Sequence, residues 1–206
     1  MSTAEMTAAT SAVPAGHELL LRLAGRFPDE LLWRLRDWLA SGTTGSADAV
    51  GSVLPRTLLR HRIGLDDDER ALLAAVVGPG SPSRRLVAAV LPGSTTPEIT
   101  FGAAEPDLGI WSARSVVAGH PGATGLHVAT RGDGAQVVLV RCAATTAAKP
   151  AGLTAVLQRL LRVHGERTPR VEVLPGDVEP PAYHRDALAA STTVWTGSPA
   201  LAGTAP

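Results

Sequence analysis

HVATRGDGAQVVLVRCA, residues 127–143, is the stretch that decides the fold of the second half of the chain. Apolar and polar residues alternate on both sides of residues 132–134, and alternation with a period of two is typical of strands. Because Gly132, Asp133 and Gly134 supply the backbone conformations of a tight turn, the stretch predicts a β-hairpin. The Arg-Gly-Asp triplet at 131–133 is then the exposed tip of the hairpin, and we expect it to form the turn.

The register of this hairpin decides which side chains share a face of the sheet. In the simplest register Thr130 lies opposite Ala135, and His127 then lies opposite Val138. This register predicts that His127 and Cys142 lie on the same face, because residues two apart along a strand point the same way.

A histidine and a cysteine on one face are a candidate nucleophile and base, with His120 as a further candidate. The alternative is that Cys142 is a small apolar side chain beneath a covering helix, which is a common role for a free cysteine. We favour the alternative. No further ligands have a suitable spacing, so we expect no metal site.

A covering helix is predicted by PAGLTAVLQRLLRVHG, residues 150–165, which ends at Gly165. Gln158, Arg159 and Arg162 are predicted to face water. RVEVLP (170–175), ITFG (99–102) and the loosely alternating DLGIWSARSVVAG (107–119) predict further strands. The helix's apolar stripe is predicted to contain Leu153, Val156, Leu157, Leu160 and Leu161.

The N-terminal half contains the candidate binding site for a partner. PDELLWRLRDWLASG, residues 28–42, predicts a helix with an inward stripe that includes Leu35 and Trp38. Trp33 then lies on the far face, beside Leu32 and Arg36. Tryptophan and arginine are enriched at interaction hot spots, so these three residues are the candidate partner-binding residues. The alternative is that neighbouring helices cover both faces.

Four consecutive acidic residues, 66–69, follow Leu65 in the stretch LDDDERALLAAVV. They could mark a divalent-metal site. The spacing of Asp66 and Glu69 fits a capping box, and the acids between them suit the positive end of a helix. We therefore interpret them as a helix cap.

The order of these elements predicts an α+β fold: an N-terminal helical unit, followed by a small, mainly antiparallel sheet that an amphipathic helix covers. Residues 1–15 are small and polar, and we expect them to be disordered. The helical unit is predicted over 16–91 and the sheet unit over 92–178. A short helix and a flexible tail are predicted over 179–206.

Composition limits the function. The chain has 206 residues, a formal net charge of zero and one cysteine, which excludes an intramolecular disulfide framework. Phosphate-binding and serine-hydrolase motifs are missing from the sequence. We expect a soluble, cytoplasmic, non-catalytic interaction factor without a cofactor: an adaptor, chaperone-like or regulatory protein. Its expected partner is another protein or a second copy, and not nucleic acid or a membrane. The alternative is a small enzyme that uses His127 and Cys142, or His120.

One resemblance supports a chaperone-like role. The order of LGIWSARSVVAG, GLHVATRGDGAQVVLVRCA, GLTAVLQRLLRVHG and RVEVLP resembles one half of the EspG proteins. LDDDERALLAAVV followed by SRRLVAAVL resembles the segment before that sheet. The EspG proteins are chaperones of ESX (type VII) secretion systems that bind secreted helical substrates. The resemblance is one of element order over about residues 65–175, so it transfers no binding residue.

Overall fold

The computed structural model describes residues 3–42, 44–95, 97–144 and 149–197. It divides into two compact units, residues 1–98 and 99–206. The predicted α+β fold is confirmed, but the boundary lies a few residues after the predicted one between 91 and 92. The reason is a local pairing. The N–H of Leu65 donates to the carbonyl of Leu91 at 2.9 Å, and the N–H of Gly93 donates to the carbonyl of Leu65 at 3.0 Å, so residues 91–93 stay with the helical unit.

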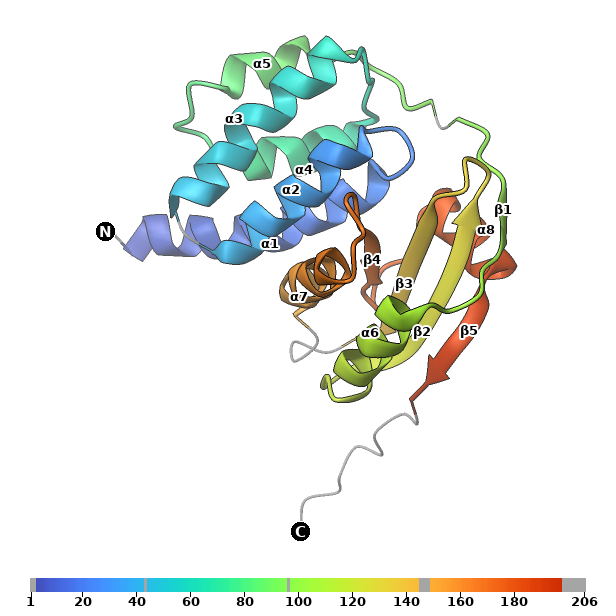
Figure 1. Cartoon of the computed structure of the whole chain (residues 1–206). Helices are drawn as coiled ribbons and strands as arrows, with labels where there is room; N and C mark the ends of the chain where they lie inside the picture. Colours follow the sequence, from blue (N-terminus) through green and yellow to red (C-terminus); the bar gives the residue numbers. More distant parts are fainter. Residues whose placement is uncertain (1–2, 43, 96, 145–148, 198–206) are drawn as a thin grey trace. The chain divides into compact units, whose positions relative to one another are not determined.

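The first unit is helical (Figure 1), with a core of leucine side chains that are almost completely buried, among them Leu23, Leu35, Leu54, Leu58 and Leu73. The strongest contacts join the first helix to the fourth and the second to the third. The described helices of this unit are α1 (Thr3–Arg22), α2 (Asp29–Ser41), α3 (Thr44–Arg60), α4 (Asp67–Val77) and α5 (Arg84–Ala89).

Two of these helices begin earlier than the sequence predicts. Helix α1 begins at Thr3, within the segment expected to be disordered, because this segment is rich in alanine, the strongest helix former. The sequence PRTLLR (55–60) suits the start of a helix with Pro55 at its first position, but helix α3 begins at Thr44 and contains Pro55 in its interior. A proline inside a helix removes only one backbone hydrogen bond, and packing of the unit offsets this loss.

The acidic residues at the start of α4 form the predicted cap. Asp66 accepts a hydrogen bond from the N–H of Glu69 at 2.8 Å, and Glu69 accepts one from the N–H of Asp66 at 3.1 Å. The other carboxylate oxygen of Glu69 pairs with Arg26 at 2.5 Å, and both side chains are buried. The capping interpretation is therefore confirmed, and Glu69 also ties α4 to the turn between α1 and α2.

The second unit is built on a mixed, five-stranded sheet within the described residues. One edge of β2 pairs with β3, and the other edge pairs with β5 along its first half and β1 along its second half. All these pairs are antiparallel. Only β3 and β4, which α7 connects, are parallel. The elements are β1 (Phe101–Ala103), α6 (Leu108–Ala118), β2 (Ala123–Arg131), β3 (Gln136–Cys142), α7 (Pro150–Val163), β4 (Arg170–Leu174), α8 (Ala182–Ala190) and β5 (Thr192–Thr196).

The β2–β3 hairpin is confirmed, but its predicted register is wrong by one residue. The N–H of Arg131 donates to the carbonyl of Ala135 at 2.8 Å, which leaves three residues, 132–134, in the turn. Gly134 has a φ of +82°, a conformation that favours glycine and is typical of three-residue hairpin turns. Thr130 consequently lies opposite Gln136, and His127 lies opposite Leu139.

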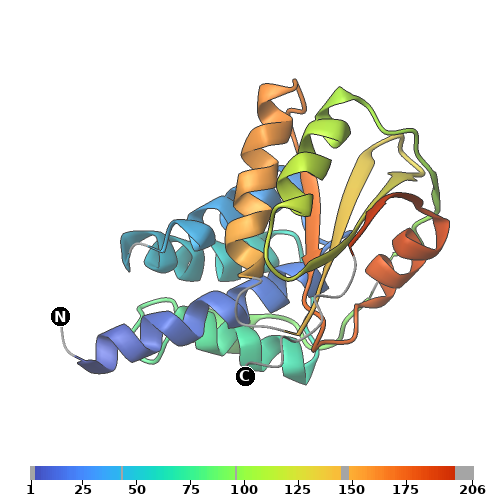
Figure 2. The same ribbon diagram turned by 90° about the horizontal axis from the view of Figure 1, so that it is seen from below.

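Helices cover both faces of the sheet (Figure 2). Helices α6 and α7 pack on the face that carries Leu126, Val138 and Val171, which we call the α6–α7 face. Helix α8 contacts β1, β2 and β3, and its His184 reaches Glu172 on the opposite face, the α8 face. The sheet is therefore the middle layer of three.

Helix α6 corrects the strand predicted over 107–119. Asp107 caps the helix by accepting a hydrogen bond from the N–H of Ile110 at 2.9 Å. Ile110, Ala113 and Val117 are buried at spacings of three and four residues, which fit a helix and not a strand. The loose alternation of apolar and polar residues over 107–119 favoured the wrong prediction.

Helix α7 confirms the predicted covering helix with two changes. Leu153, Leu157 and Leu161 are buried against the sheet as predicted. Val156 is exposed, although we predicted it to face inward, and Gln158 is buried, although we predicted it to face water. The buried arc is thus rotated around the helix axis relative to the predicted stripe.

The C-terminal segment also differs from its prediction as a short helix and a flexible tail. The predicted helix is α8, and it is followed by β5, which pairs with β2 and so belongs to the sheet. Alternation in the sequence TTVWT is the local signal for this strand. Residues 198–206 lie outside the described residues.

Leu157→Ala tests the packing of α7. Leu157 is completely buried in the core, so its truncation should lower the free energy of unfolding by about 2–5 kcal/mol. Val156→Ala, one residue away on the exposed side, should change it by less than about 0.5 kcal/mol. Urea denaturation measures both values, and equal losses would contradict the described orientation of α7.

Candidate functional site

The structure does not bring His127 and Cys142 together. Cys142 lies on the α6–α7 face, in the core with Leu126 and Val138. His127 lies opposite Leu139, and its side chain therefore points to the α8 face. The two side chains lie on opposite faces of the sheet, so they do not form the predicted pair of a nucleophile and a base.

The surroundings of the two side chains also differ from those of a catalytic pair. Burial raises the pKa of the Cys142 thiol to about 11, so the thiol is protonated at neutral pH. Burial, and then the positive charge of Arg141, lower the pKa of His127. The Nδ1 atom of His127 is 3.2 Å from the hydroxyl of Thr193 on β5. His120 lies in the turn between α6 and β2, and its buried Nδ1 has no hydrogen-bond partner within the described residues.

The Arg-Gly-Asp triplet forms the predicted turn. The guanidinium of Arg131 donates two hydrogen bonds to the carboxylate of Asp133, at 2.6 and 3.0 Å. Asp133 also accepts the N–H of Ala135 at 3.1 Å. The arginine and the aspartate therefore bind each other and hold the turn.

The candidate partner-binding residues on α2 are not all accessible. Leu32 and Arg36 are buried, and the Arg36 guanidinium donates to the carbonyl of Leu20 at 3.1 Å. Trp33 is half-buried, with the guanidinium of Arg34 at 5.6 Å from the centre of its ring. Trp38, which we predicted to face inward, is exposed. The buried stripe contains Leu32, Leu35 and Leu39, so the predicted stripe was placed on the wrong arc of the helix.

A buried contact between a histidine and a glutamate was not predicted from the sequence. The Nε2 atom of His184 on α8 is 2.9 Å from a carboxylate oxygen of Glu172 on β4, and both side chains are almost completely buried. Tyr183, the neighbouring residue, packs edge-on against Phe101 of β1. Removing one partner of a buried pair leaves the other without compensation. The contact thus fixes α8 on the sheet, and its local sequence signal is only one glutamate within a run of buried valines.

Large apolar side chains are exposed on the outer side of α6 and α7, which lie side by side (Figure 1). We call the surface formed by Leu108, Trp111, Val156 and Val163 the α6–α7 outer surface. Leu108 and Val163 are 73% and 85% exposed, and the other two are about half exposed. This surface was not predicted from the sequence, because residues 107–119 were expected to form a strand and Val156 was expected to face inward.

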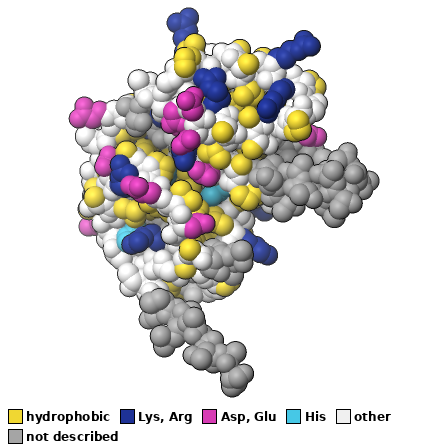
Figure 3. Space-filling model, turned by 180° about the vertical axis from the view of Figure 1, so that it is seen from behind, with side chains coloured by type: hydrophobic (Ala, Val, Ile, Leu, Met, Phe, Trp, Pro, Cys, Tyr) yellow, Lys and Arg dark blue, Asp and Glu magenta, His cyan; other side chains and the backbone are white. Residues whose placement is uncertain are grey.

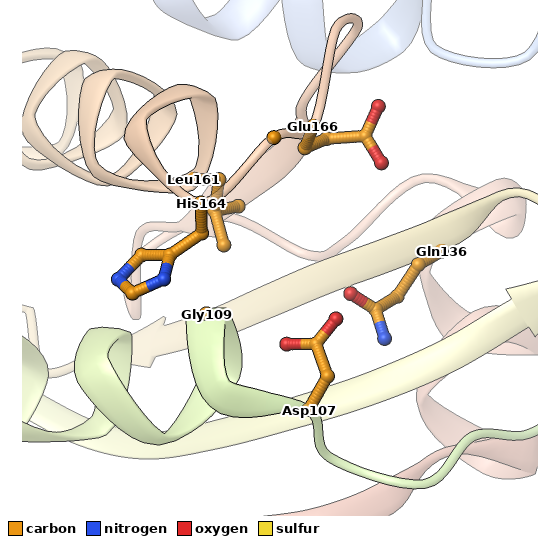
Figure 4. Close-up of a pocket in the computed structure, with 7 residues that line it drawn as sticks. Asp107, Gly109, Gln136, Leu161, His164 and Glu166 are labelled. Carbon is orange, nitrogen blue, oxygen red and sulfur yellow. The ribbon is translucent and has the colours of Figure 1, made fainter.

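A pocket of about 220 Å³ lies where α6 begins and α7 ends (Figure 4). The side chains of Asp107 and Gln136 point toward each other, whereas those of His164 and Glu166 point away from them. Gly109 allows the close approach of the two helices, because a Cβ atom there would lie 3.3 Å from side-chain atoms of Leu161 and His164. The pocket is smaller than the usual site for a small molecule, which occupies roughly 300–1,000 Å³. It has room for one side chain.

On the face shown in Figure 3, the described charged side chains do not form a patch of one sign. Acidic and basic side chains are intermixed on the face shown in Figure 3, as expected for a chain with a net charge of zero. Within the described residues, three or more histidine, cysteine or acidic side chains do not gather in a group that could hold a metal ion. None of the described helices has the length and apolar character needed to cross a membrane.

Comparisons of the chain with protein-family models, curated proteins and solved structures find no match. The resemblance to the EspG proteins therefore stays a prediction based on the order of the elements.

Asp133→Ala tests the role of the turn. The hydrogen bonds from Arg131, with a smaller effect from the N–H of Ala135, lower the pKa of Asp133 from 3.8 to about 2. A lowered pKa in the folded state stabilises the fold above about pH 4, and this stabilisation is lost as the pH falls toward 2. Because the side chain is half exposed, we expect the substitution to cost at most about 1 kcal/mol at pH 7 and less at pH 2.5.

Urea denaturation at the two pH values measures this difference, with the exposed Asp177→Ala as the control. A cost that is the same at both pH values would contradict a role for the Asp133 carboxylate in the turn.

Labelling with a thiol reagent tests the state of Cys142. A buried thiol with a pKa of about 11 should stay unlabelled between pH 7 and 8.5 and should react fully in denaturant. Rapid labelling of the native protein, increasing with pH, would show instead that the thiol is accessible and reactive.

Proposed function

We propose that this chain is a non-catalytic protein-interaction factor, an adaptor, chaperone-like or regulatory protein that binds another protein in the cytoplasm. The observation that carries the proposal is the α6–α7 outer surface. Leu108, Trp111, Val156 and Val163 expose apolar area on two neighbouring helices. Clustered exposed apolar side chains mark interaction sites more often than scattered ones do.

Trp111 gives this surface the composition of a binding site. Tryptophan is the residue type most enriched at interaction hot spots, and arginine is enriched as well. Arg114 is exposed one helical turn after Trp111, and Arg159 is exposed between Val156 and Val163 on α7. The chaperone-like role that the EspG resemblance implies is one form of the proposed function.

The alternative, a small enzyme that uses His127 and Cys142 or His120, is less favoured. Its two central residues lie on opposite faces of the sheet, and burial keeps the thiol protonated. We therefore propose a function that needs neither a nucleophile nor a cofactor.

Leu108→Ser/Trp111→Ser tests the proposed function. The full chain is immobilised, partners are captured from the native host and their amounts are compared by quantitative mass spectrometry. Both side chains are exposed, so the variant should fold normally and should lose a partner by at least about tenfold. Trp38→Ser, a change of an exposed tryptophan on α2, should retain that partner.

An unchanged set of captured proteins with the double variant would contradict the proposal. Loss with Trp38→Ser alone would place the binding site on α2 of the helical unit.

A further inference from the structure

The charges around the α6–α7 outer surface follow a simple pattern. Helices α6 and α7 contain arginines but no acidic residue. Arg114 is exposed beside Trp111 on the side of α6 away from α7, and Arg159 is exposed beside Val156 and Val163. The apolar stripes are therefore flanked by positive charge on both sides.

The end of this surface has the opposite charge. The lining of the pocket at the start of α6 and the end of α7 includes Gly109 and His164, which follow Leu108 and Val163 in the chain. Asp107 directs its carboxylate toward Gln136, whereas Glu166 points away from them and accepts the N–H of Thr168 at 2.9 Å. Neither arginine nor lysine lines the pocket. The C-terminal end of α7 and the N-terminal end of α6 both lie at the pocket, and their opposite partial charges offset each other, so the Asp107 carboxylate sets the sign of the charge there.

Two groups at the pocket are suited to hold a cation. Asp107 uses Oδ1 to cap α6, and a carboxylate can accept several hydrogen bonds at once. Gln136 points its amide toward Asp107 from β3. A carboxylate and an amide oxygen are good acceptors for the fork of donors on a guanidinium or for an ammonium group. The volume of about 220 Å³ suits one such side chain and not a larger ligand.

We propose that the protein partner covers Leu108, Trp111, Val156 and Val163 with an apolar patch flanked by acidic side chains, and inserts one arginine or lysine side chain into the pocket at Asp107 and Gln136. This inference rests on the proposed function and specifies the chemistry of the partner. The apolar patch supplies affinity, whereas the inserted cation and the acidic flanks fix the orientation of the partner.

A second copy of this chain fits the surface less well. In a two-fold interface the same surface of each copy meets that of the other copy. Each flank then faces either the same flank or the opposite flank of the second copy. Both flanks carry arginine near the middle of their helices, at Arg114 and Arg159. Positive charge would therefore meet positive charge in either arrangement.

An anionic membrane surface also fits less well. Exposed tryptophan and arginine are compatible with lipid headgroups. However, Asp107 and Glu166 lie at one end of the same surface and would face the negative headgroups. A protein partner can offer charges of both signs, which matches the pattern that the surface presents.

The pocket is tested with N-acetyl-arginine amide and its neutral isostere, N-acetyl-citrulline amide, as probes of the full chain. Backbone amide NMR shifts of Gly109, Gln136 and Glu166 report on binding. The arginine probe should bind at least about tenfold more tightly than the citrulline probe, because only the former is charged. Asp107→Asn should weaken the arginine probe by about tenfold, since asparagine retains the helix cap but removes the charge.

The matched control is Asp133→Asn, which removes a carboxylate outside the pocket and should leave binding of the probe unchanged. Equal binding of the two probes, or no shift with either, would overturn the inference of an inserted cation. Partner capture that still depends on Trp111 would then show that the proposed function stands without it.

Two further measurements address the other occupants. Arg114→Glu/Arg159→Glu should reduce partner capture at least about tenfold, while replacement of both arginines by lysine should retain most of it. Binding to vesicles of phosphatidylcholine and phosphatidylglycerol, or self-association in sedimentation experiments, would overturn the inference if Leu108→Ser/Trp111→Ser abolished it.

Discussion

The three-residue turn at the tip of the β2–β3 hairpin is the constraint on which the second unit depends. The hydrogen bond between Arg131 and Ala135 and the positive φ of Gly134 fix the turn, and the turn fixes the register. Strand β2 also pairs with β1 and β5, and β3 pairs with β4, so one register determines the faces of the whole sheet. A shift of one residue between β2 and β3 would reverse the faces of one strand relative to the other, so that His127 and Cys142 would lie on the same face.

Local signals in the sequence predict many elements correctly. The hairpin, the capping box of α4 and the covering helix α7 each follow from neighbouring residues. The register of the hairpin cannot be predicted from neighbouring residues. The glycines at 132 and 134 are compatible with a turn of two residues and with a turn of three, and the two turns give registers that differ by one residue. Helix α6 was predicted as a strand because apolar and polar residues alternate loosely over 107–119, although Asp107 as a cap and the spacing of Ile110, Ala113 and Val117 indicate a helix.

The candidate sites are harder to predict because they combine distant segments. The pocket joins Asp107, Gln136 and Glu166, which come from three places in the sequence. To predict the α6–α7 outer surface, both helices must be predicted, and so must the side of each helix that faces the sheet. An error in either leaves the surface unpredicted. On α2 the buried face was predicted at the wrong angle around the helix axis. Leu32 and Arg36, which are buried, were therefore predicted to bind a partner, and Trp38, which is exposed, was predicted to face inward.

The most direct test of this account is the register of the hairpin in solution, measured by backbone nuclear Overhauser effects in the full chain. The account predicts contacts across the strands that link His127 with Leu139, Val128 with Val138 and Thr130 with Gln136. Contacts that link His127 with Val138 and Thr130 with Ala135 would contradict it, because His127 and Cys142 would then lie on the same face of the sheet.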